Sequence, residues 1–155
     1  MNVKLLPLLL LLIALAGCQE KKIFDDFDTD MPDNRWQKAA IKTFEFTIDE
    51  EARNYDVSVH FAYLSDFVVN PVPLTVTIHY PDSSIENKEI KIVVQDKEGK
   101  ETGDCGGDYC DIQEAVFVNE ALPSGNYTIK IQQQFNGPYL PNVNGIGIEV
   151  VAKAD

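Results

Sequence analysis

Apolar and polar residues alternate with a period of two through much of this sequence, and this pattern limits the folds open to the chain. The clearest run is Tyr55 to Tyr63, in which every second residue is aromatic or valine. Because successive side chains of a β-strand point to opposite faces, such a run predicts a strand with one buried face. Shorter runs of the same kind cover residues 41–48, 74–80, 90–94, 112–118, 127–133 and 146–151. Together they predict about seven strands.

Turn-forming residues separate the predicted strands. Groups containing Pro, Gly, Asn or Asp lie at residues 70–71, 80–82, 97–99, 123–126 and 136–138. No stretch of about ten or more residues keeps a helical period, and only residues 36–43 are compatible with one short helical turn. Short strands joined by turns, without intervening helices, indicate an all-β fold. We expect an antiparallel β-sandwich, with a jelly roll as the variant.

The N-terminus follows a different pattern, that of a secretory signal. Lys4 precedes an apolar run that ends at Leu15. Its length fits the core of a signal peptide, about 7–15 residues, and is too short for a membrane-spanning helix of about 20. Leu15, Ala16 and Gly17 then precede Cys18, which is typical of recognition by a lipoprotein signal peptidase. The alternative is an ordinary secretory signal with a chance cysteine.

From this pattern we expect residues 1–17 to be removed and Cys18 to carry a covalent lipid, diacylglycerol with N-acyl chains such as palmitate. Two or three acyl chains hold a protein at a membrane durably. The remaining 138 of the 155 residues fit one domain. We assign residues 18–34, which are polar and acidic, to a lipidated N-terminal tether, and residues 35–155 to a single β-sandwich domain.

The charge of the chain argues against a nucleic-acid partner. It has 25 acidic and 13 basic residues, a formal net charge of −12. Binding to phosphates needs a basic stripe, and no cluster of cations denser than Lys21-Lys22 is present. We therefore expect the membrane, through the lipid anchor, and other proteins as partners.

Two cysteines remain beyond the signal, Cys105 and Cys110. The signal sends them to an oxidising compartment, where a disulfide is expected. Closure of so small a loop contributes about 2 kcal/mol in the chain-entropy model. The alternatives are a redox pair, or a metal site formed by both thiols with the carboxylates of Asp104, Asp108 and Asp111. Structural zinc normally needs four ligands and redox motifs normally have two intervening residues, so we predict the disulfide.

Candidates for catalysis are few. The chain has two histidines, His60 and His79, and no Gly-x-Ser-x-Gly elbow. Both histidines fall on the polar faces of predicted strands. If these strands pair, the two side chains could bind a metal weakly. We prefer the interpretation that both histidines are simply exposed. The acidic segments 25–30 and 96–99 lack the spacing of an EF-hand loop and are interpreted as solvated turns. We predict no catalytic residue, no metal and no cofactor beyond the lipid.

A set of aromatic residues allows two interpretations. Stacked on an exposed surface, they would bind sugars, as in carbohydrate-binding modules. Most of them lie in phase with aliphatic residues of the alternating strands, however, which favours packing in the core. The residues concerned are Tyr55, Phe61, Tyr63, Phe67 and Tyr80.

Several blocks of the mature chain form a recognisable set. The two specific blocks are residues 123–133 and 143–150. More generic landmarks are the Phe-Asp-rich opening at 23–27, the segment 34–36 with Trp36, the strand at 41–48, and residues 96–99 and 111–113. Taken together, these blocks resemble the GldH family of gliding-motility lipoproteins of the Bacteroidetes. The cysteine pair departs from the family pattern, in which a glycine-rich loop without cysteines is expected.

The resemblance implies a non-catalytic envelope lipoprotein that supports gliding motility and the associated secretion machinery through contacts with other envelope proteins of the gliding apparatus. It brings no catalytic residue. The absence of Asp directly after Cys18 favours the outer membrane, and the mixed charges of residues 19–22 favour its periplasmic face. The alternative function is that of a glycan-binding surface lipoprotein in a polysaccharide-uptake system.

Overall fold

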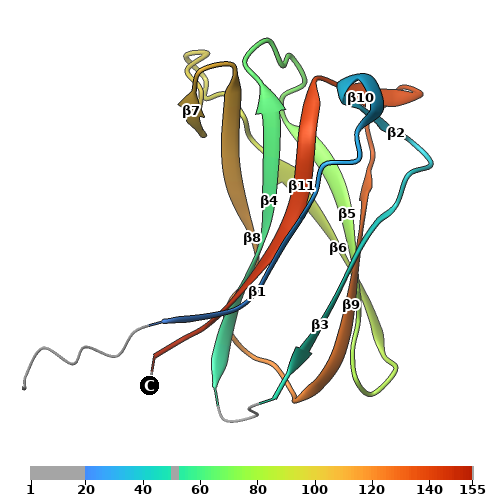
Figure 1. Cartoon of the computed structure of the whole chain (residues 1–155), viewed down its shortest axis with the longest axis vertical. Helices are drawn as coiled ribbons and strands as arrows, with labels where there is room; N and C mark the ends of the chain where they lie inside the picture. Colours follow the sequence, from blue (N-terminus) through green and yellow to red (C-terminus); the bar gives the residue numbers. More distant parts are fainter. Residues whose placement is uncertain (1–19, 50–52, 155) are drawn as a thin grey trace, which may run out of the picture.

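Two antiparallel sheets packed face to face form the body of the molecule (Figure 1). The computed structural model describes residues 20–49 and 53–154. A single 3-10 turn, η2 (Pro32–Asn34), occurs in this part of the chain. The strands are β1 (Lys21–Asp28), β2 (Arg35–Gln37), β3 (Lys42–Ile48), β4 (Asn54–Leu64), β5 (Val72–His79), β6 (Ile85–Ile92), β7 (Asp104–Gly106), β8 (Tyr109–Ala121), β9 (Gly125–Gln133), β10 (Tyr139–Pro141) and β11 (Val143–Ala152).

The strand pairing is nested. One sheet has the order β1-β11-β4-β8-β7 and the other has the order β3-β9-β5-β6, so β1 pairs with β11, β3 with β9, β4 with β8 and β5 with β6. Pairing of the first strand with the last, and so on inward, is the connectivity of a jelly roll. The predicted sandwich and its expected variant are therefore confirmed. Among the described residues no helix is long and apolar enough to cross a membrane.

The core lies between the two sheets and is closed at one end by a small ribbon. β2 and β10 pair there, with Trp36 opposite Leu140, and both side chains are fully buried. The Trp36 indole Nε1 donates to the carbonyl of Ala40 (2.7 Å). Gln133, also fully buried, donates to the Trp36 carbonyl and accepts from the Phe135 amide, so its polar atoms are satisfied inside the protein.

The predicted aromatic set belongs to this core. Tyr55, Phe61, Tyr63 and Phe67 are buried, and Phe61 packs against both Tyr63 and Phe67. Tyr80 is half-buried, and its hydroxyl donates to Glu86 (2.6 Å). Packing in the core, which alternation favoured, is the interpretation that the structure confirms.

Residues 21–28, which we assigned to the tether, instead form β1, an edge strand paired with β11 along its length. The sandwich thus begins earlier than residue 35. The alternating pattern did not predict this strand, because a bulge between Lys22 and Phe24 shifts the register. Phe24 then packs against Phe46 of the opposite sheet (ring centroids 5.3 Å apart), while Phe27 covers the outer face.

A glycine pair in β11 receives the Phe27 ring. Cβ atoms added at Gly145 and Gly147 would both collide with Phe27, and at Gly147 also with the Asp26 carbonyl at 2.5 Å. Only glycine therefore allows this aromatic ring to lie directly on the strand. We call the paired strands β1 and β11, with the Phe27 contact, the β1–β11 seam. Lys22 strengthens it by bonding to Glu149 (2.5 Å) and Asp25 (2.8 Å).

The seam also joins the other sheet. Lys42 of β3 is 6% exposed, and its ammonium donates to the Asp28 carboxylate (2.9 Å) and the Asp30 carbonyl (2.7 Å). A cation this deeply buried needs such partners to offset its lost hydration. Together with the Phe24–Phe46 contact, this ion pair closes the side of the sandwich between β1 and β3.

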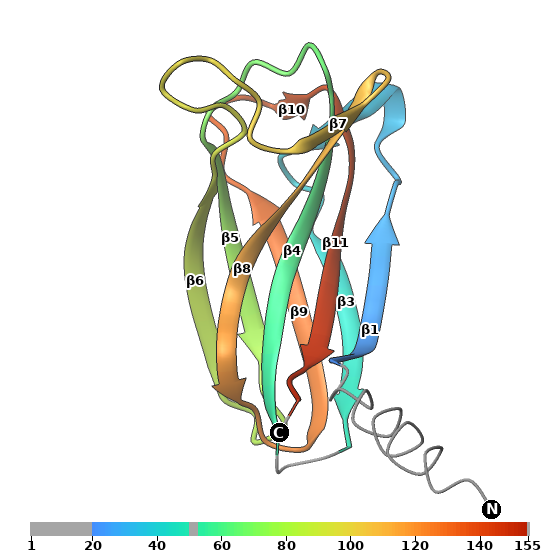
Figure 2. The ribbon, with the colours of Figure 1, turned by 90° about the vertical axis from the view of Figure 1, so that its left-hand side faces the viewer.

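The two ends of the sandwich are built differently (Figure 2). β1 starts at one end, where the chain also leaves β11; we call it the N-terminal end. The opposite end holds the short β7–β8 hairpin and the loop between β4 and β5; we call it the hairpin end. The eleven residues of β4 span the distance between the ends, which corresponds to roughly 33 Å at 3.3 Å per residue.

Candidate interaction surface at the hairpin end

The predicted lipidation site lies outside the described residues. Cys18 and the peptidase recognition residues Leu15, Ala16 and Gly17 all precede Glu20, where the described part of the chain begins. The other predicted site residues lie within it, most of them near the hairpin end.

Cys105 and Cys110 are joined by a disulfide, as predicted. They face each other across the β7–β8 hairpin, where Cys105 is paired with Cys110 in the strand register. Gly107, at the turn, has a positive φ of 64°, a conformation that glycine adopts without strain. The disulfide and the turn together fix a short, protruding hairpin.

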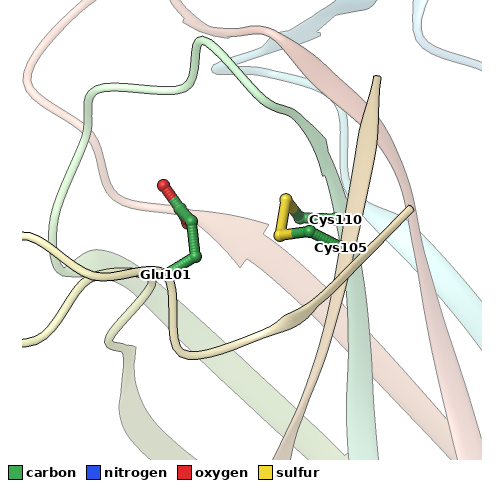
Figure 3. A group of neighbouring side chains, drawn as sticks. All are labelled: Glu101, Cys105 and Cys110. Atoms are coloured by element: carbon green, nitrogen blue, oxygen red, sulfur yellow. A yellow bond between two sulfur atoms is a disulfide. The ribbon is translucent and has the colours of Figure 1, made fainter. Parts of the chain in front are cut away.

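Glu101 lies beside the bonded sulfurs (Figure 3). Its carboxylate accepts hydrogen bonds from the Tyr63 hydroxyl and from Gln95 Nε2, both at 2.8 Å. Burial, and then the bond to Glu101, raise the pKa of the Tyr63 hydroxyl above its ordinary range, so it acts as a neutral donor. Because both sulfurs are in the disulfide and Glu101 is engaged, this cluster joins the loop before β7 to β4 rather than offering thiolate ligands.

The two histidines do not meet. His60 lies on β4 and His79 on β5, strands of different sheets, so the weak metal site that we considered for paired strands is not formed. His60 packs against Phe27 (ring centroids 4.9 Å apart), and its Nε2 lies 3.0 Å from Asp111 Oδ1. Asp111 is therefore tied to the outer face of β4.

The acidic segments considered for calcium have other roles. Asp96 Oδ1 accepts from the backbone amides of Glu98 (2.8 Å) and Lys100 (2.9 Å) and so stabilises a turn. In the other segment, residues 25–28 belong to β1, and Asp28 Oδ1 accepts from the Asp30 amide. The segment 96–99 is thus a turn, as predicted, whereas residues 25–28 belong to a strand and not to the solvated turn that we expected.

Backbone hydrogen bonds join the loops of the hairpin end. The Ser65 amide, in the loop after β4, donates to the Asp108 carbonyl at the hairpin turn (3.0 Å). On the other side, the Leu64 amide donates to the Asn142 carbonyl (3.0 Å). Asn142 Nδ2 in turn reaches the Asp66 carbonyl at 3.4 Å. The loop and the hairpin are thus held as one platform.

Apolar and acidic side chains are exposed on this platform. Val68 is 81% exposed and Tyr109 49% exposed. No hydrogen bond or ion pair within the described ranges engages the carboxylates of Asp66, Asp104 and Asp108. Asp104 also lines a shallow hollow, together with His60, Asp111 and Gln113. We call Asp66, Val68, Asp104, Asp108 and Tyr109 the hairpin patch.

Comparison with known proteins gives the family. The sequence model described as GldH lipoprotein matches residues 23–150, which run from β1 to its partner β11. This chain belongs to the GldH lipoprotein family. This is a family of gliding-motility lipoproteins, and it is not a known family of enzymes. The match covers both strands of the seam, in agreement with the resemblance expected from the sequence blocks.

A curated relative carries the same family name. The gliding motility lipoprotein GldH of Flavobacterium johnsoniae is 23% identical over 128 residues, covering 81% of this chain and 77% of the relative. Among solved structures, the VP2 protein of infectious bursal disease virus aligns with 88% of this chain at 12% identity and a TM-score of 0.41. The chain spans about a third, 32%, of that protein. A family 35 carbohydrate binding module from Clostridium thermocellum aligns with 84% of this chain and 97% of its own length, at 13% identity and a TM-score of 0.36. Likenesses at such TM-scores say nothing about function.

The blocks that resembled the GldH family have structural roles. The block at 143–150 contains Gly145 and Gly147, which leave a notch in β11. The block at 23–27 supplies the Phe27 ring that fills this notch. In the block at 123–133, Gly125 adopts a φ of 131° with its Cα beside Pro81, and the Tyr127 hydroxyl donates to the Pro123 carbonyl (2.8 Å). These blocks thus support the fold. Of the hairpin patch, the sequence analysis singled out Asp104 and Asp108, as candidate metal ligands beside the cysteine pair, and it missed Asp66, Val68 and Tyr109.

Proposed function

We propose that this chain is a lipid-anchored, non-catalytic component of the gliding apparatus and its associated secretion machinery, and that it acts through contacts with other envelope proteins. Membership of the GldH lipoprotein family carries this proposal. The described site agrees with it, because the hairpin end presents exposed side chains on a fixed platform rather than a deep polar cleft.

Anchoring at Cys18 would bring one end of the sandwich to the membrane. Three peptide units separate Cys18 from Lys21, the first residue of β1, and they span at most about 11 Å when fully extended. A lipid on Cys18 therefore holds the N-terminal end within the headgroup region. With its strands upright on the membrane, the sandwich would hold the hairpin end roughly 33 Å beyond the N-terminal end, since β4 runs the length of the sandwich.

The outer membrane is the location that we propose, with the periplasmic face as the side. No Asp follows Cys18, and the residues directly after it carry mixed charges, Glu20 with Lys21 and Lys22. The first feature favours the outer membrane, by analogy with lipoprotein sorting in better-known envelopes. The second favours the periplasmic face, because surface-exported lipoproteins of the Bacteroidetes tend to carry an acidic tag after the cysteine.

The aromatic residues considered for glycan binding do not form the surface that this alternative would need. Sugar-stacking platforms use exposed aromatic rings, and the aromatic residues of the set considered for this role are buried or, for Tyr80, half-buried and bonded to Glu86. We therefore propose the motility role alone.

An in-frame deletion in the native organism tests the proposal. We expect loss of colony spreading and reduced release of secreted proteins, both restored by the wild-type gene. Complementation with Cys18→Ala should fail, because the chain then lacks its anchor. Complementation with Val118→Ser, an exposed position on β8 outside the hairpin patch, should succeed. Normal spreading and secretion of the deletion strain, when its parent glides, would refute the role.

A further inference from the structure

We propose that the hairpin patch is the docking surface for a basic protein partner, one that presents Lys or Arg side chains around an apolar recess. The inference rests on the proposed function, since it names the surface through which the chain makes its contacts in the gliding apparatus. Exposed apolar side chains and carboxylates without internal partners are carried there by two segments that a backbone hydrogen bond joins.

The apolar residues give the patch its anchors. Val68 and Tyr109 are exposed by 81% and 49%, and their two segments are joined by the hydrogen bond from the Ser65 amide to the Asp108 carbonyl. Single exposed apolar residues are common on any surface. Tyrosine on a fixed backbone, however, is among the residues that contribute most to protein interfaces. Val68 and Tyr109 are therefore placed to enter a recess on a partner.

The charges select the partner. The segments 64–70 and 101–113 contain five acidic residues, Asp66, Glu101, Asp104, Asp108 and Asp111, and no Lys or Arg. Glu101 and Asp111 are engaged inside the protein, whereas the carboxylates of the patch are free to accept from outside. Carboxylates form their strongest hydrogen bonds with Arg and Lys. The hollow between His60, Asp104 and Asp111 is open to one such cationic side chain.

The rigidity of the platform favours binding. The disulfide fixes the hairpin, and hydrogen bonds from Ser65 and Asn142 fix the loop that carries Val68. A surface that is already ordered loses little conformational entropy when a partner docks. The cysteine pair, which departs from the expected family pattern, would then serve to hold this chain's own binding hairpin.

A second copy of the chain fits the patch poorly. In a two-fold dimer the same patch meets itself, so the carboxylates of Asp66, Asp104 and Asp108 would face their equivalents. Like charges placed opposite each other weaken an interface and reject the wrong partner. With a formal net charge of −12, the chain offers a second copy little compensation. The charges thus favour a different, basic protein.

Photo-crosslinking in the native organism tests the proposal on the full chain. The photoreactive residue p-benzoylphenylalanine replaces Val68 in one strain, Tyr109 in a second and Val118, which is 68% exposed on β8, in a third. We expect an adduct with one other protein from positions 68 and 109 and none from 118. Mass spectrometry should place the crosslink within a segment of the partner that bears Lys or Arg.

Charge neutralisation supplies the matched comparison. Asp66→Asn, Asp104→Asn and Asp108→Asn together should reduce the adduct by about tenfold or more, the change that 1.4 kcal/mol of lost interaction produces, and should abolish spreading. Neutralising three exposed carboxylates elsewhere, with Glu45→Gln, Asp49→Asn and Glu120→Gln, should change neither. All variants should keep the wild-type melting temperature and amount of protein.

Each failure has its own meaning. An adduct that contains only this chain would replace the basic partner by a second copy. An adduct insensitive to the Asp→Asn changes, or none at positions 68 and 109, would overturn the docking surface. In both cases the proposed function stands if the deletion strain fails to spread. Normal spreading of the deletion strain refutes the proposed function but not an adduct that depends on these aspartates.

Discussion

The β1–β11 seam and the hairpin patch treat their polar and apolar groups in opposite ways. In the seam, Phe27 lies in its glycine notch, and Lys22 bonds to both Asp25 and Glu149. In the patch, Tyr109 is half exposed, and the carboxylates of Asp104 and its neighbours have no partner among the described residues. The groups of the seam are thus paired within the fold, whereas those of the patch remain available to another molecule.

This difference separates what identifies the family from what would select a partner. The blocks that resemble the GldH family contribute the notch at Gly145 and Gly147 and the Phe27 ring. The disulfide hairpin carries part of the patch. A shared fold with a distinct surface is how proteins of one architecture acquire separate contacts. The seam should therefore tolerate substitution poorly, and the patch well.

The same methyl group added in each region gives the sharpest contrast. In the seam, Gly147→Ala places a Cβ 2.5 Å from the Asp26 carbonyl and 2.7 Å from the Phe27 ring. The backbone atom has little freedom to move, so we expect the free energy of unfolding to fall by about 1–3 kcal/mol. In the hairpin, Gly106→Ala meets nothing within 4 Å, and we expect a change within about 0.5 kcal/mol. Urea denaturation of the purified proteins measures both.

Removal of the Phe27 ring separates the two collisions of the methyl group that Gly147→Ala adds, one with the Phe27 ring and one with the Asp26 carbonyl. Phe27→Ala by itself should lower the free energy of unfolding. The double variant Phe27→Ala with Gly147→Ala should lose less unfolding free energy than the two single variants added together, because the collision with the ring is gone. A double-mutant cycle gives this coupling. Equal effects of the alanine substitutions at Gly147 and Gly106 would break the contrast between the regions.

Opening the disulfide should affect the patch more than the fold. The ring closed by Cys105 and Cys110 has a sequence separation of 5, for which the chain-entropy model gives about 2 kcal/mol or less. We expect a reductant to lower the unfolding free energy by that amount and to leave the β-sheet circular dichroism intact. A Cys105→Ser, Cys110→Ala variant should not respond to the reductant. Global unfolding on reduction would show that the hairpin supports the fold.

The sequence predicted best where a pattern is local. Tyr55 to Tyr63 alternates with one buried face, and β4 occupies residues 54–64. The strand β1 was missed because its bulge breaks alternation, and because Phe27 packs on glycines more than a hundred positions away, which no local pattern encodes. The separation of His60 from His79 depends likewise on sheet topology. The exposure of Val68 follows from loop packing, so the docking surface could not be read from the sequence.

The smallest effect that we predict is a pH dependence at the N-terminal end, beside the seam. The Asn119 amide donates to Asp56 Oδ1 (2.7 Å), and Lys153, which also bonds to Glu20, donates to Asp56 Oδ2 (3.0 Å). These bonds, the backbone one first, lower the pKa of the Asp56 carboxyl in the folded state. A lowered pKa stabilises the fold above the ordinary carboxyl pKa of about 3.9, and this stability is lost as the pH falls through the folded value.

Because the Asp56 side chain is 34% exposed, solvent screening limits this contribution to under about 1 kcal/mol. Asp56→Asn should thus be less stable than wild type at pH 7, and the difference should vanish toward pH 2 in urea denaturation. Asp104→Asn, which removes a carboxylate without a partner in the described structure, should match wild type throughout. A deficit of Asp56→Asn that stays constant with pH would mean that the charge of the carboxylate contributes nothing to the stability of this end of the molecule.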